Sequence, residues 1–412
     1  MHSKPAARHQ IPTGEGILER PEHPGLVGRP VYLDYNATTP VDPRVAAAMQ
    51  RALTTDFGNA SSAHYYGDAP RRLLGAARAQ VAALVGATGD EVVFTGSGSE
   101  ADALAVRGAV LARAGAVPGR PHLITQVTEH PAVLAACQHL QRWHDVEVTY
   151  LPVDQFGRLD PGDVRAAMTP STVLVTVMHA NNETGTLQPL ADIAELTRAR
   201  GVLLHTDAAQ SAGKVPLDVD QLGVDLLTVV GHKMYAPKGI AALYVRAGVT
   251  LEPLVGGGGQ ERGLRAGTEN VAHSAALGSA AELAGHALAA GETERLAELR
   301  DQLHAELTAQ LPERVHLHGH PVHRLPNTLN IRVDAATGRD LLAAAPGVAA
   351  STGSACHAGD DQPSTGLLAL GLTAAQAAAA LRLTVGRWTT PDEIAAAARM
   401  LRDAYDAVTA TR

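Results

Sequence analysis

The amino-acid sequence predicts an α/β fold, with a large domain built on a mainly parallel sheet and a smaller α+β domain. Three observations lead to this prediction. The chain has 412 residues, and at about 100 to 200 residues per domain this length suggests two or three domains. Short apolar runs alternate with helical patterns up to about residue 245, and a glycine-rich stretch, 256–259, ends this rhythm. We therefore expect two domains of unequal size.

The apolar runs in the first part of the chain are typical of buried strands. They are too short for helices and are bounded by polar residues or glycine, as in strands covered on both faces. Helical patterns between them, such as 68–85, 100–112 and 190–200, imply right-handed crossovers with helices on both sides of the sheet. The expected strands are 92–94, 122–125, 146–151, 172–178, 202–205, 226–230 and 241–245.

The pattern changes after the glycine-rich stretch. A long helical stretch, 271–311, is followed by a strand at 328–333, a helix near Asp340 and a closing helix from Pro391. We therefore predict a mobile N-terminal arm over residues 1–29, a large domain over 30–270 whose first residues can pack with the small domain, and a small domain over 271–412.

The composition argues against several classes of partner. The formal net charge is −8, whereas nucleic-acid and membrane surfaces require clustered positive charge. The two cysteines, Cys137 and Cys356, lie far apart and outside metal-binding spacings. We therefore expect no disulfide framework, no metal site and a reducing compartment. No segment is apolar enough to cross a bilayer, and we expect a cytoplasmic protein that binds small molecules or other proteins.

Polar residues directly after the predicted strands are the first candidates for a site. Ligands of open α/β sheets bind beyond the carboxyl ends of the strands. The first strand is followed by Thr95-Gly96-Ser97-Gly98-Ser99-Glu100, where small residues and hydroxyls at a helix N-terminus suit a phosphate group. A tight turn without a ligand explains the same residues about as well, and the stretch is neither a P-loop nor a dinucleotide fingerprint.

Two charged residues follow later strands. Asp207 lies where a carboxylate can keep a pyridine nitrogen protonated, although a helix N-cap explains it as readily. Lys233 lies where desolvation lowers the pKa of an amine and allows it to form an imine, although a surface lysine is the ordinary alternative. A phosphate nest, an acid and an amine thus follow in order at separate strand ends, and pyridoxal phosphate requires these three anchors.

Two further residues extend the candidate site. His130 follows the strand at 122–125 and could stack on the cofactor ring, although a lone histidine is more often structural. Asn182 follows the strand at 172–178 and could meet the ring hydroxyl or a substrate carboxylate, although a turn explains it nearly as well.

Six motifs occur in order along the chain: YLDYNATTP at 32–40, NNETG at 181–185, HTDAAQ at 205–210, GHK at 231–233, the stretch 256–268, and STGSAC at 351–356. Together they resemble the cysteine desulfurase and selenocysteine lyase family of the class-V aminotransferase group. The resemblance extends from about residue 31 to about residue 398. It implies a fold type I pyridoxal phosphate enzyme.

The resemblance also implies roles for the matching residues. Lys233 resembles the lysine that holds the cofactor as a Schiff base, and Asp207 the partner of the ring nitrogen. Arg382 resembles the arginine that binds the substrate carboxylate with its guanidinium fork. Other cofactor contacts are implied for Gly98, Ser99, His130, Asn182, Gln210, His232 and Thr268. Among these, His130 stacks on the ring and takes part in catalysis, Asn182 also meets the substrate, and Thr268 reaches the phosphate of the other subunit, so that a homodimer is implied.

Cys356 matches the catalytic cysteine of the family, which accepts the substrate sulfur as a persulfide while alanine departs. By composition alone Cys356 is more often a small core residue, but the glycine and serine residues of 351–359 predict a flexible exposed loop. Cys137 lies in an apolar helical stretch, and we expect it to be structural.

The expected function is that of a cysteine desulfurase, which converts L-cysteine to L-alanine and passes the sulfur to a thiol or sulfur-carrier protein. A selenocysteine lyase is the alternative, because Val230 stands where bacterial desulfurases have serine and because 355–364 resembles the lyases. A class-V transaminase or C–S lyase without persulfide transfer, for which Cys356 is dispensable, is less favoured. A non-catalytic relative is the least favoured.

Overall fold

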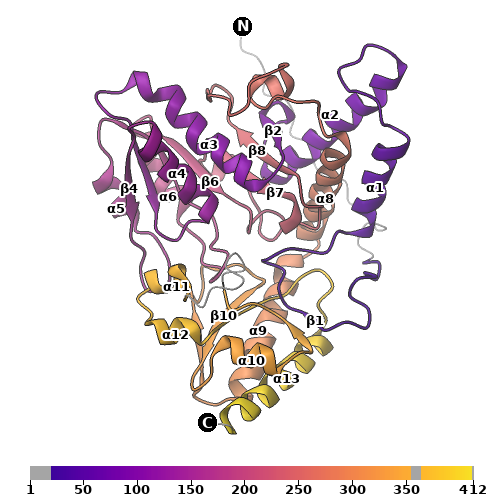
Figure 1. The fold of residues 1–412 in the computed structure, drawn as a ribbon, viewed down its shortest axis with the longest axis vertical. Helices are drawn as coiled ribbons and strands as arrows, with labels where there is room; N and C mark the ends of the chain where they lie inside the picture. The colour runs from indigo at the N-terminus through magenta and orange to yellow at the C-terminus, as the bar shows by residue number, and fades with distance from the viewer. Residues whose placement is uncertain (1–19, 354–362, 411–412) are drawn as a thin grey trace.

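The computed structural model describes residues 20–353 and 363–410. A larger layered part stands above a smaller part that includes the C-terminal helix (Figure 1). The larger part is built on a seven-stranded sheet of order β2-β8-β7-β6-β5-β3-β4. Its strands are β2 (Val92–Thr95), β3 (His122–Gln126), β4 (Glu147–Leu151), β5 (Thr172–Thr176), β6 (Leu203–Asp207), β7 (Leu226–Val230) and β8 (Ala241–Val245).

The large sheet is mainly parallel, which confirms the predicted fold class. Strands β3 to β7 pair in parallel, and β8 runs antiparallel to both β7 and β2. Since β2 and β7 are both antiparallel to β8, they point in the same direction as the other strands. The expected strands at 226–230 and 241–245 have the observed bounds, whereas the expected strand at 172–178 ends two residues earlier, at Thr176.

Helices cover both faces of this sheet. On one face, α3 (Gly98–Arg113) and α4 (Pro131–Trp143) share a core with Leu123, and on the other α2 (Tyr65–Val85), α6 (Leu190–Arg198) and α8 (Val271–Ala289) share a core with Ile124. Leu123 and Ile124 are successive residues of β3, and their side chains point to opposite faces of the sheet because side chains alternate along a strand. The helices α1 (Pro43–Thr54), α5 (Pro161–Ala167) and α7 (Val219–Leu222) complete this part. None of the helices described is long and apolar enough to cross a membrane.

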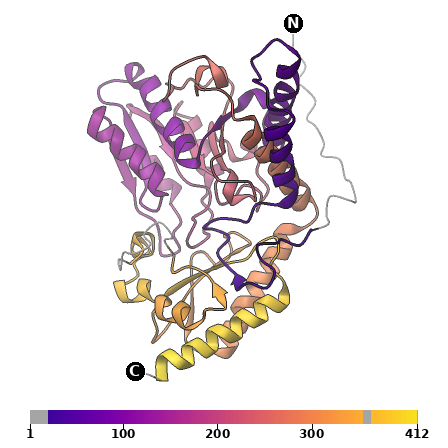
Figure 2. The same ribbon diagram turned by 45° about the vertical axis from the view of Figure 1, so that its right-hand side comes forward.

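The smaller part has its own antiparallel sheet of order β12-β10-β9. The strands β9 (Val315–His318), β10 (Thr328–Val333) and β12 (Ala380–Thr384) pack with α9 (Glu292–Gln310), α10 (Gly338–Ala344) and α13 (Pro391–Ala410). Figure 2 shows α13 along the lower edge of this part. A two-stranded pair, β1 (Val31–Tyr32) with β11 (Val348–Ala349), and the short helices α11 (Thr365–Ala369) and α12 (Ala374–Ala378) complete it.

The predicted helical stretch 271–311 consists of two helices, because Gly291 adopts a left-handed conformation with φ of 84° between α8 and α9. Helix α8 packs against α1 and α2 in the larger core, and α9 packs in the smaller core. Leu33, before α1, also belongs to the smaller core. The domain limits remain a prediction, and this packing leads us to propose Gly291 rather than residue 270 as the boundary.

The N-terminal arm expected over residues 1–29 overlaps the described residues only from residue 20. There the Arg20 guanidinium lies 2.7 Å from Glu292, and the Trp388 indole N–H donates to the Pro21 carbonyl at 2.9 Å. Residues 20 and 21 are therefore attached to the smaller part and to the loop before α13.

The close approach of α2 and α8 predicts a stability effect at Gly278. A Cβ atom there would lie 2.6 Å from Ala77 Cα, so we expect Gly278→Ala to lower the free energy of unfolding by about 1–3 kcal/mol through overpacking. Gly75→Ala on α2 is the matched control, because a Cβ there meets nothing within 4 Å, and we expect it to stabilise by about 0.5–1 kcal/mol. Urea unfolding of both variants checks this, and equal stabilities would contradict the tight packing.

Candidate active site

A cavity of about 560 Å³ lies at the carboxyl ends of the large sheet. Strand-end residues line it from the larger part, and Arg382 and Thr365 line it from the smaller part. The structure brings nine of the predicted site residues together on its wall: Gly98, Ser99, His130, Asn182, Asp207, Gln210, His232, Lys233 and Arg382. Thr268 is exposed and is not part of this wall. Cys356 lies outside the described residues.

Lys233 ends a 3₁₀ turn, Gly231–Lys233, directly after β7. Its Nζ donates hydrogen bonds to the carbonyl oxygens of Asn36 and Ala37, both at 2.7 Å. These two carbonyls belong to the YLDYNATTP motif, which explains why that motif and the lysine occur together. The amine thus lies at the cavity wall, and both of these acceptors are neutral.

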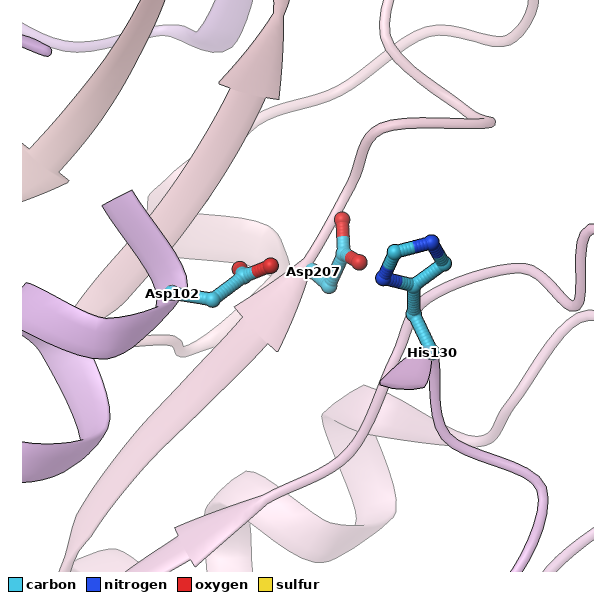
Figure 3. Close-up of side chains that lie close together, drawn as sticks. All are labelled: Asp102, His130 and Asp207. Carbon is cyan, nitrogen blue, oxygen red and sulfur yellow. The ribbon is translucent and has the colours of Figure 1, made fainter. Parts of the chain in front are cut away.

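Asp207 ends β6 and is buried between Asp102 of α3 and His130 (Figure 3). One ligand atom from each of these three residues lies within 4.8 Å of the other two. Burial raises the pKa of Asp207, whereas the hydrogen bond from the Ala209 N–H and the charge of Lys233 lower it. Burial, and then the charge of Asp207, raises the pKa of Asp102 well above its usual value. We infer that Asp102 retains its proton and that Asp207 is the carboxylate of the pair.

Asp207 fits the nitrogen of a pyridine ring. Its Oδ1 accepts one hydrogen bond, from the Ala209 N–H at 2.8 Å. In the described part of the chain, no lysine or arginine forms an ion pair with it within 4.0 Å. A buried carboxylate without a cationic partner is costly, and a protonated ring nitrogen would supply that partner.

His130 caps the N-terminus of α4. Its Nδ1 accepts the Ala132 N–H at 3.2 Å, so that in the neutral ring the proton resides on Nε2. Burial lowers the pKa of His130, which keeps the ring neutral and suited to stacking. The helix cap and the proposed stacking role are compatible, since the cap uses only Nδ1.

The phosphate end of the site is formed by the N-terminus of α3. Ser97 caps this helix by accepting the Glu100 N–H, and Gly98 and Ser99 form its first turn at the cavity wall. A Cβ atom on Gly98 would lie 2.6 Å from Val230 Cγ2, so the Val230 side chain leaves no room for any residue larger than glycine at this position. A helix N-terminus of this kind favours an anion.

Arg382 lies on β12 and is only 1% exposed. Its Nη2 donates to Asp34 Oδ1 at 2.9 Å and its Nη1 to the Asn182 carbonyl at 3.1 Å. Its Nε has no hydrogen-bond partner among the described residues. A buried guanidinium that faces the cavity with an unused N–H is suited to bind a carboxylate.

Four residues around the site were missed by the sequence analysis. These are Asp34, Asp102, Glu129 and Lys214. Burial raises the pKa of Glu129 to about 8, and its Oε1 accepts the Met178 N–H at 2.6 Å. The only signal for Glu129 was its position next to His130. The only signal for Asp34 was its place inside the YLDYNATTP motif. Asp102 and Lys214 had no comparable signal.

The lysine, the buried acid and the helix N-terminus, arranged at the strand ends of a mainly parallel sheet, define a fold type I pyridoxal phosphate enzyme. Residues 31–396 match the aminotransferase class-V family. A cysteine desulfurase IscS of Anaeromyxobacter sp. (strain Fw109-5) is 46% identical over 368 residues, which are 89% of this chain and 90% of the relative. A cysteine desulfurase of Trichormus azollae is 45% identical, over 88% of this chain and 90% of the relative.

Solved structures agree with these relatives. A NifS-like protein superimposes with a TM-score of 0.84 at 30% identity, covering 92% of this chain and 99% of that one. A structure described as SspA in complex with cysteine has a TM-score of 0.76 at 33% identity, covering 87% of this chain and 99% of that one. The chain belongs to the aminotransferase class-V family and, within it, to the cysteine desulfurases. Its cofactor is pyridoxal phosphate.

Proposed function

We propose that this protein converts L-cysteine to L-alanine and transfers the sulfur to Cys356 as a persulfide. The observation that carries the proposal is the cavity in which Lys233, Asp207 and Arg382 meet, in a chain whose relatives are cysteine desulfurases. The similarity to a structure described as a complex with cysteine supports the same substrate. A reducing, cytoplasmic setting is part of the proposal, because a free thiol must act.

Each side chain of the cavity has a distinct task in this reaction. When bound, pyridoxal phosphate supplies an electron sink that labilises bonds at the substrate carbons. Asp207 would hold the ring nitrogen and the α3 N-terminus the phosphate. Arg382 binds the substrate carboxylate and thereby orients Cα, and the Lys233 amine accepts and returns the proton at Cα. His130 covers the ring and excludes water from one face.

The sulfur transfer requires a thiolate at Cys356. The thiolate sulfur attacks the substrate sulfur, an S–S bond forms, and the Cβ–S bond breaks. The electron pair of the broken bond remains with the substrate carbon, which is then protonated to give alanine. A thiol or a sulfur-carrier protein takes the sulfur from the persulfide in a second exchange.

Mass spectrometry tests this proposal directly. After incubation with L-cysteine, we expect the peptide that contains Cys356 to gain the mass of one sulfur atom while alanine accumulates. The peptide that contains the buried Cys137 is the internal control and should stay unchanged, because burial raises the pKa of this thiol to about 12. Alanine formation without any added sulfur on Cys356 would refute the proposal.

Selenocysteine is the alternative substrate, and Val230 is the observation in its favour. A valine side chain faces Gly98 at the phosphate end, where bacterial desulfurases carry serine. Turnover of the two amino acids should be compared side by side. Alanine formation from selenocysteine alone would replace the desulfurase assignment with that of a selenocysteine lyase.

A homodimer is part of the proposal. Thr268 is exposed in the single chain and away from the cavity, as expected for a residue that serves the partner's phosphate. Phe57, Tyr65 and Tyr66 form a contacting aromatic group and are 66%, 82% and 58% exposed. Exposed apolar groups of this kind are typical of interfaces. Light scattering would measure the mass of the particle, and a monomer would contradict this part.

Arg382→Lys is expected to raise the KM for L-cysteine by about tenfold to a hundredfold, since hydrogen bonds to charged groups contribute about 1.5–3 kcal/mol. Lysine keeps the charge opposite Asp34 but loses the planar fork. The visible cofactor band should persist, because Arg382 donates to Asn182 only at its main-chain carbonyl, which the substitution does not remove. Steady-state kinetics checks this, and an unchanged KM would exclude Arg382 from substrate binding.

A further inference from the structure

Lys214 is a buried amine that the proposed reaction does not use. Its side chain lies behind the cavity and is not part of the cavity wall. Its Nζ donates to Gln210 Oε1 at 2.9 Å, and the described residues offer that amine no other hydrogen-bond partner. Burial, and then the charges of Lys233 and Arg382, lowers the pKa of Lys214 to about 7. Burying an amine against one neutral group is unfavourable for folding, so this contact requires a functional explanation.

The contact fixes which way the Gln210 amide faces. Gln210 lines the cavity, and its Nε2 donates to the Asn36 carbonyl at 3.0 Å. The Asn36 carbonyl can only accept, and the Lys214 amine can only donate when it is protonated, so the two partners together determine the orientation. If the amide were flipped, its N–H groups would face the Lys214 amine and its carbonyl oxygen would face the Asn36 carbonyl oxygen. The second N–H of Nε2 is therefore kept for a group in the cavity.

The same Asn36 carbonyl accepts the Lys233 amine at 2.7 Å. Gln210 and the cofactor-binding lysine thus share one acceptor, and Gln210 lies beside the position where the cofactor ring must be attached. An N–H donor at this place would be available to an oxygen substituent of a ring held between Lys233 and Asp207.

We propose that Lys214 is a positioning residue, which fixes the Gln210 amide so that its remaining N–H donates to the ring oxygen of pyridoxal phosphate. The inference rests on the cofactor assignment and extends it to a residue that does not reach the ligand. A purely structural lysine would need only its packed stem, and methionine would then replace it without effect on the cofactor.

A double-mutant cycle of Lys214→Met and Gln210→Ala tests the proposal. The readouts are the dissociation constant of pyridoxal phosphate and the pH midpoint at which the bound cofactor changes its visible absorption. We expect each single variant to bind the cofactor about threefold to tenfold more weakly and to raise the pH midpoint, because the lost donor stabilises the anionic ring oxygen. The double variant should be no worse than Gln210→Ala alone.

Lys238→Met is the matched control, because it removes a lysine of the cavity wall and Lys238 is not hydrogen-bonded to Gln210. Its effect should add to that of Gln210→Ala. Additive effects of Lys214→Met and Gln210→Ala, or a Lys214→Met protein with the wild-type midpoint, would overturn the proposal.

Gln210→Glu covers the case in which Lys214→Met does not fold. Glutamate keeps a partner for Lys214 but removes the N–H donor, including its bond to the Asn36 carbonyl, so we expect a folded protein with weaker cofactor binding. Wild-type cofactor binding in this variant would overturn the role of Lys214. A wild-type protein without any visible band would instead refute the cofactor assignment itself.

Discussion

Lys233→Ala is expected to remove the visible absorption of the covalently held cofactor and to lower the rate of alanine formation by at least about 10⁴-fold. The amine is the covalent attachment point and also the base at the substrate Cα. Within residues 20–353 and 363–410, no other lysine amine reaches this position: Lys214 is turned toward Gln210, and Lys238 lies at the exposed rim of the cavity. Absorption spectra and single-turnover assays of the purified variant measure both effects.

Lys238→Ala is the control for this experiment, because it removes a lysine from the same cavity wall. It should retain the visible band. Unfolding of the Lys233→Ala protein should be little changed, since the amine donates two of its hydrogen bonds to neutral main-chain carbonyls. A visible band that persists in Lys233→Ala and disappears in Lys238→Ala would show that Lys238, and not Lys233, holds the cofactor.

Asp207→Asn is expected to lower kcat by about 10²- to 10³-fold, the range seen when one preorganised electrostatic group is lost. Asparagine preserves the shape of the side chain and its contact with the Ala209 N–H, but it has no charge to stabilise a protonated ring nitrogen. The cofactor should therefore bind and remain a poor electron sink. Rates of Cα proton exchange, measured by NMR in D₂O, should fall with kcat.

Asp102→Asn provides the comparison, because Asp102 lies beside Asp207 and is buried in the same way. Since we infer that Asp102 is already neutral, its replacement by a neutral amide should change kcat by less than about tenfold, the scale of one neutral hydrogen bond. A larger loss from Asp102→Asn than from Asp207→Asn would exchange the roles of the two acids.

The strand-end residues were predictable from the sequence because the local pattern alone places them at one edge of the sheet. Gly98, Asp207 and Lys233 each lie within four residues of the end of an apolar run, and parallel strands bring such positions together. Arg382 was identified only through the resemblance to the family, because its short strand adjoins an alanine-rich run that has a helical composition.

The remaining residues depend on contacts that are distant in the sequence. Asp34 and Arg382 pair across 348 positions, and no local pattern encodes such a contact. Asp102 faces the site only because α3 lies across the sheet, and Lys214 matters only through the Gln210 amide. The break at Gly291 was missed because helix-forming residues continue the pattern on both sides of it, mainly alanine before it and glutamate and leucine after it.

The pairing of β1 with β11 has a consequence for the order in which the protein is completed during synthesis. Residues Val31 and Tyr32 emerge early but find their partners only after Val348 and Ala349 have been made, and Asp34 must wait still longer for Arg382. The larger sheet can fold while the chain is being made, since domains form as units from the N-terminus. The substrate pocket, however, closes only near the end of translation, so a ribosome-bound fragment that stops at Gly291 should have a formed sheet but no carboxylate-binding site.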